Sequence, residues 1–202
     1  MGVSLQRLLP GQKTEDMEDR YSDKSYLRYK MKSLRMVVPE AERKSAAEEV
    51  FERLEKTAAF MLAERILMYH SLPDELYTLD FLKKWSGRKR FYLPRVNGVD
   101  LEVLPYEETR LELGSFHIEE PTGNDVTDPE EIELVVVPAV AYDRKGKRLG
   151  RGKGFYDRFL KTTKATKVGV GYEFQLVDEV PSEPHDVAMD MVITQHTTIV
   201  IK

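Results

Sequence analysis

The stretch Leu134-Val135-Val136-Val137-Pro138 leads, through residues 139–147, into Arg148-Leu149-Gly150-Arg151-Gly152-Lys153-Gly154-Phe155-Tyr156-Asp157. Its first four residues are apolar and mostly β-branched, which predicts a short strand buried on both faces that ends at Pro138. Residues 155–160 predict the first turns of a helix. Everything between the strand and the helix is predicted to be one loop, in which the last glycines recur at every second position.

This loop has the features of an anion-binding turn. Glycine allows positive φ and lets a ligand approach the backbone N–H groups closely. Such N–H groups next to a helix N-terminus attract phosphate. Arg148, Arg151 and Lys153 add side chains that form charge-assisted hydrogen bonds to phosphate oxygens. The alternative is a solvated β-to-α loop whose glycines only turn the chain.

Composition narrows the classes of protein. The chain has 202 residues, of which 41% are hydrophobic and 33% charged, as expected for one globular domain. It has no cysteine, which excludes disulfides, thiolate zinc sites and cysteine nucleophiles. Aromatic residues beside the basic loop leave nucleic acid formally open, but the net charge of −4 argues against it. Neither a membrane-spanning apolar run nor a signal peptide is evident. We therefore expect a cytoplasmic protein with no nucleic-acid or membrane partner. We also expect a monomer with small-molecule substrates, although composition does not disclose the oligomeric state.

Strand and helix patterns alternate along the rest of the chain. Residues 1–22 are polar and are expected to be a flexible N-terminal extension, whereas 23–202 are expected to form one domain. Helices are predicted at 24–35, from 40 onward and at 79–86, and strands at 65–70, 90–94, 101–106, 134–137, 167–172, 191–194 and 198–201. Pro94 is expected to end its strand, and 113–123 to be irregular. The predicted fold is a three-layer α/β/α sandwich around a mainly parallel open sheet.

The run Arg148 to Asp157, preceded by an apolar strand, Pro138 and Asp143, resembles the signature of the 5-formyltetrahydrofolate cyclo-ligase family, also called methenyltetrahydrofolate synthetases. The resemblance is more specific than a bare GxGxG pattern and covers nearly all of 24–202. It implies ATP-dependent conversion of 5-formyltetrahydrofolate to 5,10-methenyltetrahydrofolate, with release of ADP and phosphate. Two alternatives remain from the residues: a non-catalytic nucleotide- or folate-binding protein, and a sugar-phosphate isomerase or CoA-transferase-like enzyme on a related fold.

The resemblance also implies which residues bind ATP, the co-substrate. Lys24 and Arg28 are four positions apart and share a face of the first predicted helix; by themselves they indicate a surface-exposed basic helix. Arg148 and Lys153 are the expected catalytic residues. The full ATP-binding set is Lys24, Arg28, Arg148, Leu149, Gly150, Arg151, Gly152, Lys153, Gly154, Phe155 and Tyr156.

The folate substrate is expected to contact a second set. Glu75 is expected to accept hydrogen bonds from pterin N–H groups, although by position alone it is a solvated loop carboxylate. Phe116 is either a core anchor or a ring that stacks on the pterin, where the family often has Trp. The implied substrate-binding set is His70, Glu75, Phe116, Arg151, Gly152, Lys153, Gly154 and Phe155.

Asp157 and Asp186 are the implied ligands of magnesium (Mg2+). Separated carboxylates are typical of a magnesium site that is completed by nucleotide phosphates and water. The residues alone allow another interpretation, in which Asp157 pairs with Arg148 or Arg158 and Asp186 is a turn residue.

Overall fold

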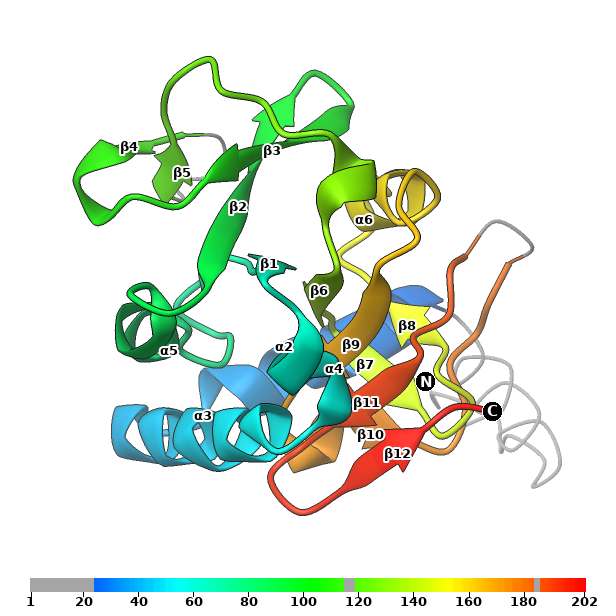
Figure 1. The fold of residues 1–202 in the computed structure, drawn as a ribbon. Coiled ribbons are helices and arrows are strands. Elements are labelled where there is room, and N and C mark those ends of the chain that lie inside the picture. The colour runs from blue at the N-terminus through cyan, green and yellow to red at the C-terminus, as the bar shows by residue number, and fades with distance from the viewer. Residues whose placement is uncertain (1–23, 115–118, 184–185) are drawn as a thin grey trace, which may run out of the picture.

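A seven-stranded sheet runs through the protein in the order β12-β11-β9-β6-β1-β2-β3 (Figure 1). The computed structural model describes residues 24–114, 119–183 and 186–202. The central pairings from β2 to β11 are parallel, and the edge strands β3 and β12 are antiparallel to their neighbours, which confirms the predicted sheet. The strands are β1 (Arg65–Leu67), β2 (Arg90–Asn97), β3 (Asp100–Pro105), β6 (Leu134–Pro138), β9 (Thr166–Val170), β11 (Met191–Ile193) and β12 (Thr198–Val200).

Alternate side chains of β6 enter two separate cores. Leu134 and Val136 pack with α3 (Glu40–Glu55), α4 (Ala58–Leu62) and α5 (Leu79–Trp85). Val135 and Val137 pack on the other face with Phe159 of α6 (Phe155–Phe159). Because the side chains of a strand alternate between the two faces of the sheet, the apolar residues of β6 pack against the helices on both faces. The three-layer prediction is confirmed, although α4 was not predicted from the sequence.

Residues 139–150 differ from the single loop that the sequence predicts. They form a hairpin of β7 (Ala141–Asp143) and β8 (Arg148–Leu149), and β10 (Leu176–Val177) pairs with β7 to make a three-stranded sheet. The buried Asp143 carboxylate accepts hydrogen bonds from the N–H groups of Lys145 and Lys147, which closes the turn. Helix α2 (Lys24–Met36) packs on this small sheet through Leu27 and Met31.

The sequence predicted that Pro94 ends its strand, but β2 continues past it. The strand continues to Asn97 and pairs with β3 through a turn at Gly98. The parallel neighbour β1 ends where Leu67 pairs with Tyr92, so Pro94 lies beyond it and its missing N–H is not required. β2 therefore projects past the sheet core and forms a wall at the carboxyl ends of the parallel strands.

The segment 113–123, predicted to be irregular, instead contains strand β5 (Glu119–Pro121) and the last residue of β4 (Leu111–Leu113). β4 pairs with β5 in an antiparallel ribbon, and Glu112 is opposite Glu120. Phe116 and the predicted extension 1–22 lie outside the described residues. Of the helices that the structure describes, none has the length and apolarity needed to cross a membrane.

Candidate active site

A cavity of about 470 Å³ lies at the carboxyl ends of β1, β2 and β6. Ligands of open α/β sheets bind at this edge, and the volume is in the range of small-molecule sites. Most predicted site residues line it: His70, Glu75, Arg148 and 150–157. Lys24, Arg28, Leu149 and Asp186 do not line it.

The glycine segment makes a tight turn at the cavity wall. Gly152 has φ +96° and Gly154 φ +71°, in the left-handed region that favours glycine, and α6 begins directly after Gly154. A Cβ at position 154 would lie 2.6 Å from Arg158 Nη1. From α2, Arg28 Nε donates to the carbonyl of Gly150 at 2.9 Å, so this predicted ATP residue reaches the turn from behind the wall.

Arg148 is held in the wall by an ion pair. Its side chain is buried, and Nη2 lies 2.7 Å from Asp157 Oδ1. The guanidinium also lies over the ring of Tyr156, at 5.6 Å from the centroid. Burial raises the pKa of Tyr156, so its hydroxyl stays protonated at neutral pH. Asp157 thus pairs with Arg148, one of the two partners considered, whereas Arg158 pairs with Asp100 at 3.3 Å.

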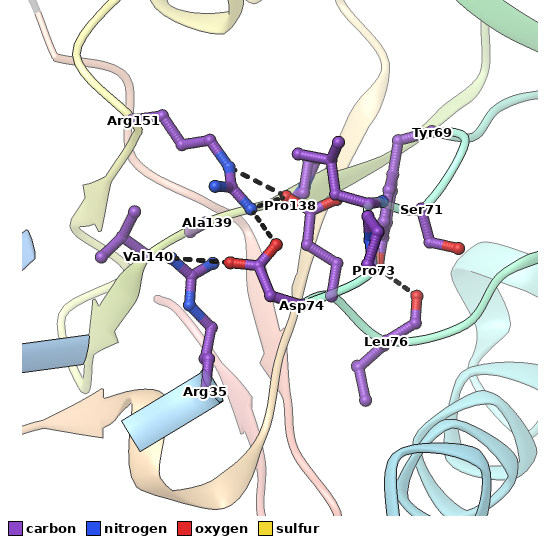
Figure 2. Close-up of polar contacts among 12 residues, drawn as sticks. Arg35, Tyr69, Ser71, Pro73, Asp74, Leu76, Pro138, Ala139, Val140 and Arg151 are labelled. Carbon is purple, nitrogen blue, oxygen red and sulfur yellow. Dashed lines mark hydrogen bonds and ion pairs between the residues drawn. The ribbon is translucent and has the colours of Figure 1, made fainter. Parts of the chain in front are cut away.

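Arg151 is held by two carboxylates of the loop after β1 (Figure 2). Nη2 lies 2.7 Å from Asp74 Oδ1 and 2.9 Å from Glu75 Oε1. The other oxygen of Asp74 faces Arg35, from the last turn of α2, at 3.3 Å, so one carboxylate joins two arginines. Burial lowers the pKa of Arg35, and Asp74 opposes that shift. Asp74 and Arg35 were missed from the sequence because each looks like an ordinary surface charge.

The two predicted magnesium ligands lie in different surroundings. Asp157 is in the cavity wall, whereas Asp186 Oδ2 lies 2.8 Å from Lys24 Nζ and accepts a hydrogen bond from the Glu183 N–H. In the described part of the chain, no three His, Asp or Glu side chains are grouped as a metal site. Magnesium needs only one or two carboxylates when phosphates complete its shell. Because Oδ1 of Asp157 is paired with Arg148, Oδ2 is the oxygen that would hold a nucleotide-bound magnesium ion.

The remaining wall comes from β2, β3 and β5. Pro94, Val96 and Leu101 are apolar, and Glu120 is a carboxylate with 8% exposure. His70 is mostly buried, with Nε2 3.0 Å from Glu119 Oε2. Burial lowers the pKa of His70, and Glu119 opposes the shift. Sequence reasoning missed this wall, since nothing local distinguishes Glu120 from its exposed neighbour.

Comparison with known proteins gives one consistent family. Residues 20–195 match the profile of the 5-formyltetrahydrofolate cyclo-ligase family. The 5-formyltetrahydrofolate cyclo-ligase of Mycolicibacterium smegmatis is 34% identical, over 88% of this chain and 96% of that protein. The corresponding Escherichia coli protein is 32% identical, over 66% of this chain and 79% of its own length.

A solved structure resembles most of this fold. The Aquifex aeolicus 5,10-methenyltetrahydrofolate synthetase superposes with a TM-score of 0.82 at 32% identity, covering 89% of this chain and 93% of that one. The agreement in fold thus covers most of this chain. This chain belongs to the 5-formyltetrahydrofolate cyclo-ligase family.

Proposed function

We propose that this protein uses ATP to convert 5-formyltetrahydrofolate to 5,10-methenyltetrahydrofolate, releasing ADP and phosphate. The observation that carries the proposal is that the positively charged glycine turn and the apolar wall of β2 and β3 line one cavity. The turn suits the phosphates of ATP. The apolar wall suits a flat heterocycle. A reaction between ATP and a folate requires both in one cavity.

The chemistry requires activation of an amide. The oxygen of the N5-formyl group is a poor leaving group. The terminal phosphoryl group of ATP is therefore transferred to this oxygen, and ADP is released. N10 then attacks the formyl carbon and loses its proton. The C–O bond breaks, phosphate leaves, and a methenyl bridge joins N5 to N10. Such a sequence depends on positioning and charge neutralisation, without a protein nucleophile.

Charge neutralisation is assigned to three side chains of the turn. Lys153 would neutralise charge on the transferred phosphoryl group, and the backbone N–H groups of 150–154 would bind phosphate oxygens. Arg148 is fixed by Asp157 and would act from a constant position. Arg151 is 41% exposed and would exchange its carboxylate partners for phosphate. Lys24 and Arg28 are proposed to bind ATP on the family resemblance, and Arg28 also donates a hydrogen bond to the Gly150 carbonyl of the turn.

Magnesium, when bound, supplies positive charge between phosphate oxygens. Asp157 is the ligand proposed from the structure's cavity wall, and Asp186 is proposed on the family resemblance. Glu75, Phe116 and His70 are proposed to contact the folate. The proposal also includes a cytoplasmic monomer that binds neither nucleic acid nor membranes. The net charge of −4 supports the absence of these two partners, and the lack of cysteine agrees with a reducing compartment.

The test is a direct assay. Purified protein with ATP, magnesium and 5-formyltetrahydrofolate is expected to produce the near-ultraviolet absorbance of the methenyl product, and omission of ATP is expected to abolish it. Lys153→Ala should lower turnover by about 10²–10³-fold while folate binding persists. Lys145→Ala, an exposed lysine in the β7–β8 turn, is the matched control and should retain full activity.

Different failures have different meanings. Folate and ATP binding without product would support the non-catalytic alternative. An unchanged rate in Lys153→Ala would show that the phosphate assignment is wrong even if the enzyme is active.

A further inference from the structure

Glu120 on β5 is a buried carboxylate in the wall of the cavity. We propose that Glu120 is a specificity-determining residue that accepts two hydrogen bonds from adjacent N–H donors of the bound heterocycle, the ring N3–H and the 2-amino group of the reduced pterin. This inference rests on the proposed function, because it assumes that the cavity binds a reduced folate. It adds a recognition residue that the family signature in residues 148–157 does not contain.

The first argument is the lack of a partner for a buried charge. Glu120 is 8% exposed, and its one hydrogen bond in the described structure is from the Val96 N–H to Oε1 at 3.4 Å. No Lys, Arg or His of the described residues lies within ion-pair distance of it. A buried carboxylate without a cation is costly unless hydrogen-bond donors satisfy it. A ligand in the cavity can supply those donors.

The second argument is a comparison with the other carboxylates of the site. Glu75 also lines the cavity, but Oε1 accepts from Arg151 and Oε2 accepts from the Leu72 N–H at 3.1 Å. Glu119, next to Glu120 in the chain, is 52% exposed and faces His70. Of these three carboxylates, Glu120 is the buried one that has no charged partner among the described residues.

The third argument is that the local backbone makes room for this side chain. A Cβ at Gly114 would overlap the Glu120 carboxylate, so any other residue there would displace it. Gly114 directly follows β4, and the β4–β5 pairing fixes Glu120 beside it. The missing Cβ at Gly114 therefore leaves the space that the Glu120 carboxylate occupies.

The chemistry of a carboxylate selects the kind of donor. Its two oxygens accept two parallel N–H bonds, which matches an amide N–H beside an amino group on one ring edge. Val96, Pro94 and Leu101 in the same wall would contact the apolar faces of such a ring. Glutamine at this position has nearly the same size, but it offers one oxygen and directs an NH2 group at a donor.

The experiment pairs a side-chain change with a ligand change. Calorimetry without ATP measures binding of 5-formyltetrahydrofolate and its 2-desamino-2-methyl analogue to wild type, Glu120→Gln and Glu112→Gln. Glu112 is the matched control because it pairs with Glu120 in the ribbon and is exposed. We expect Glu120→Gln to weaken folate binding by about 10- to 100-fold and the wild type to lose a similar factor with the analogue.

Three further results are expected. Glu120→Gln should bind folate and analogue within about threefold of each other, because the interaction is already lost. Glu112→Gln should match the wild type, and ATP binding should be unchanged in both variants. The ligand-free Glu120→Gln protein should be as thermally stable as the wild type or more stable, since a buried unpaired charge has been removed.

Two outcomes would overturn the inference while leaving the proposed function intact. One is folate affinity of Glu120→Gln within threefold of wild type. The other is full discrimination against the analogue in that variant. If Glu120→Gln does not fold, Glu120→Asp serves instead, and unchanged folate affinity there would also overturn it. Failure of the wild type to bind 5-formyltetrahydrofolate would instead contradict the proposed function.

Discussion

The two walls of the cavity differ in whether their charged side chains have partners of opposite charge. In the glycine wall, residues 148–157, the arginines are paired: Arg148 with Asp157, and Arg151 with Asp74 and Glu75. In the wall formed by β2, β3 and β5, Glu120 has no cationic partner among the described residues. A phosphate at the first wall must compete with existing ion pairs. At the second wall, a neutral N–H donor of a ligand can bind the Glu120 carboxylate without displacing another side chain.

The glycine wall itself contains a fixed cation and an exchangeable one. The side chain of Arg148 is 3% exposed, and that of Arg151 is 41% exposed. The carboxylate partners of Arg151, Asp74 and Glu75, are 26% and 10% exposed, so these pairs are only partly open to solvent. We expect a change of partners by Arg151 to cost less than breaking the Arg148 pair. Breaking a buried pair leaves an uncompensated charge. Arg148 therefore keeps its place while Arg151 responds to the ligand.

The largest expected effect comes from replacing the fixed guanidinium of Arg148. Arg148→Lys keeps the charge but cannot reproduce the planar contacts to Asp157 and the Tyr156 ring. We expect kcat to fall by about 10²–10³-fold. Steady-state assays of methenyl formation provide the measurement, and Arg144→Lys on the exposed β7–β8 turn is the control. A kcat within threefold of wild type would show that a fixed guanidinium is not needed.

The next effect tests the carboxylate shared by the two arginines. Asp74→Asn leaves buried Arg35 without its ion pair, so we expect the free energy of unfolding to fall by about 2–3 kcal/mol. Glu102→Gln, in the more exposed pair with Arg95, should cost less than about 1 kcal/mol. Urea unfolding measures both. Arg35→Met should cost less than Asp74→Asn because it removes the charge; the reverse order would contradict this account.

A smaller effect separates backbone strain from steric overlap in the glycine wall. Gly154→Ala requires a left-handed alanine and places a Cβ against Arg158, so we expect about 1–2 kcal/mol of destabilisation and at least a tenfold loss of activity. Gly98→Ala has a similar φ, +62°, with open space around it. It should lose stability through strain alone and keep full activity. Equal activity losses in the two variants would contradict the role of the turn.

The smallest effect concerns His70, which follows β1 and lines the cavity. Burial lowers its folded-state pKa below the usual 6.5, with Glu119 opposing, so the unfolded chain takes up the proton first. Neutral His70 therefore contributes stability above about pH 6.5, and that contribution is lost as pH falls toward the folded pKa. Thermal unfolding at pH 7 and pH 5 should show a smaller drop for His70→Gln than for wild type. His196→Gln, at an exposed position, should behave as wild type.

Local patterns in the chain were sufficient for most of the fold. The apolar run 134–137, the helix at 24–35 and the edge strand near the C-terminus agree with the structure. The errors occurred where a neighbour decides the outcome. Pro94 lies inside β2 because β1 has already ended, and residues 139–150 form a hairpin because α2 and β10 cover it. The sequence near Pro94 does not show where β1 ends, and the sequence near 139–150 does not show that α2 and β10 pack there.

The sequence by itself determined the glycine turn and the cations it presents, because φ preferences and charge belong to single residues and their immediate neighbours. Only the tertiary structure decided which of those cations are fixed. Arg151 meets Asp74 across 77 positions of sequence, and Glu120 is buried only because Gly114 and β2 pack around it. Burial and pairing depend on contacts between distant segments, and these form only when the sheet assembles.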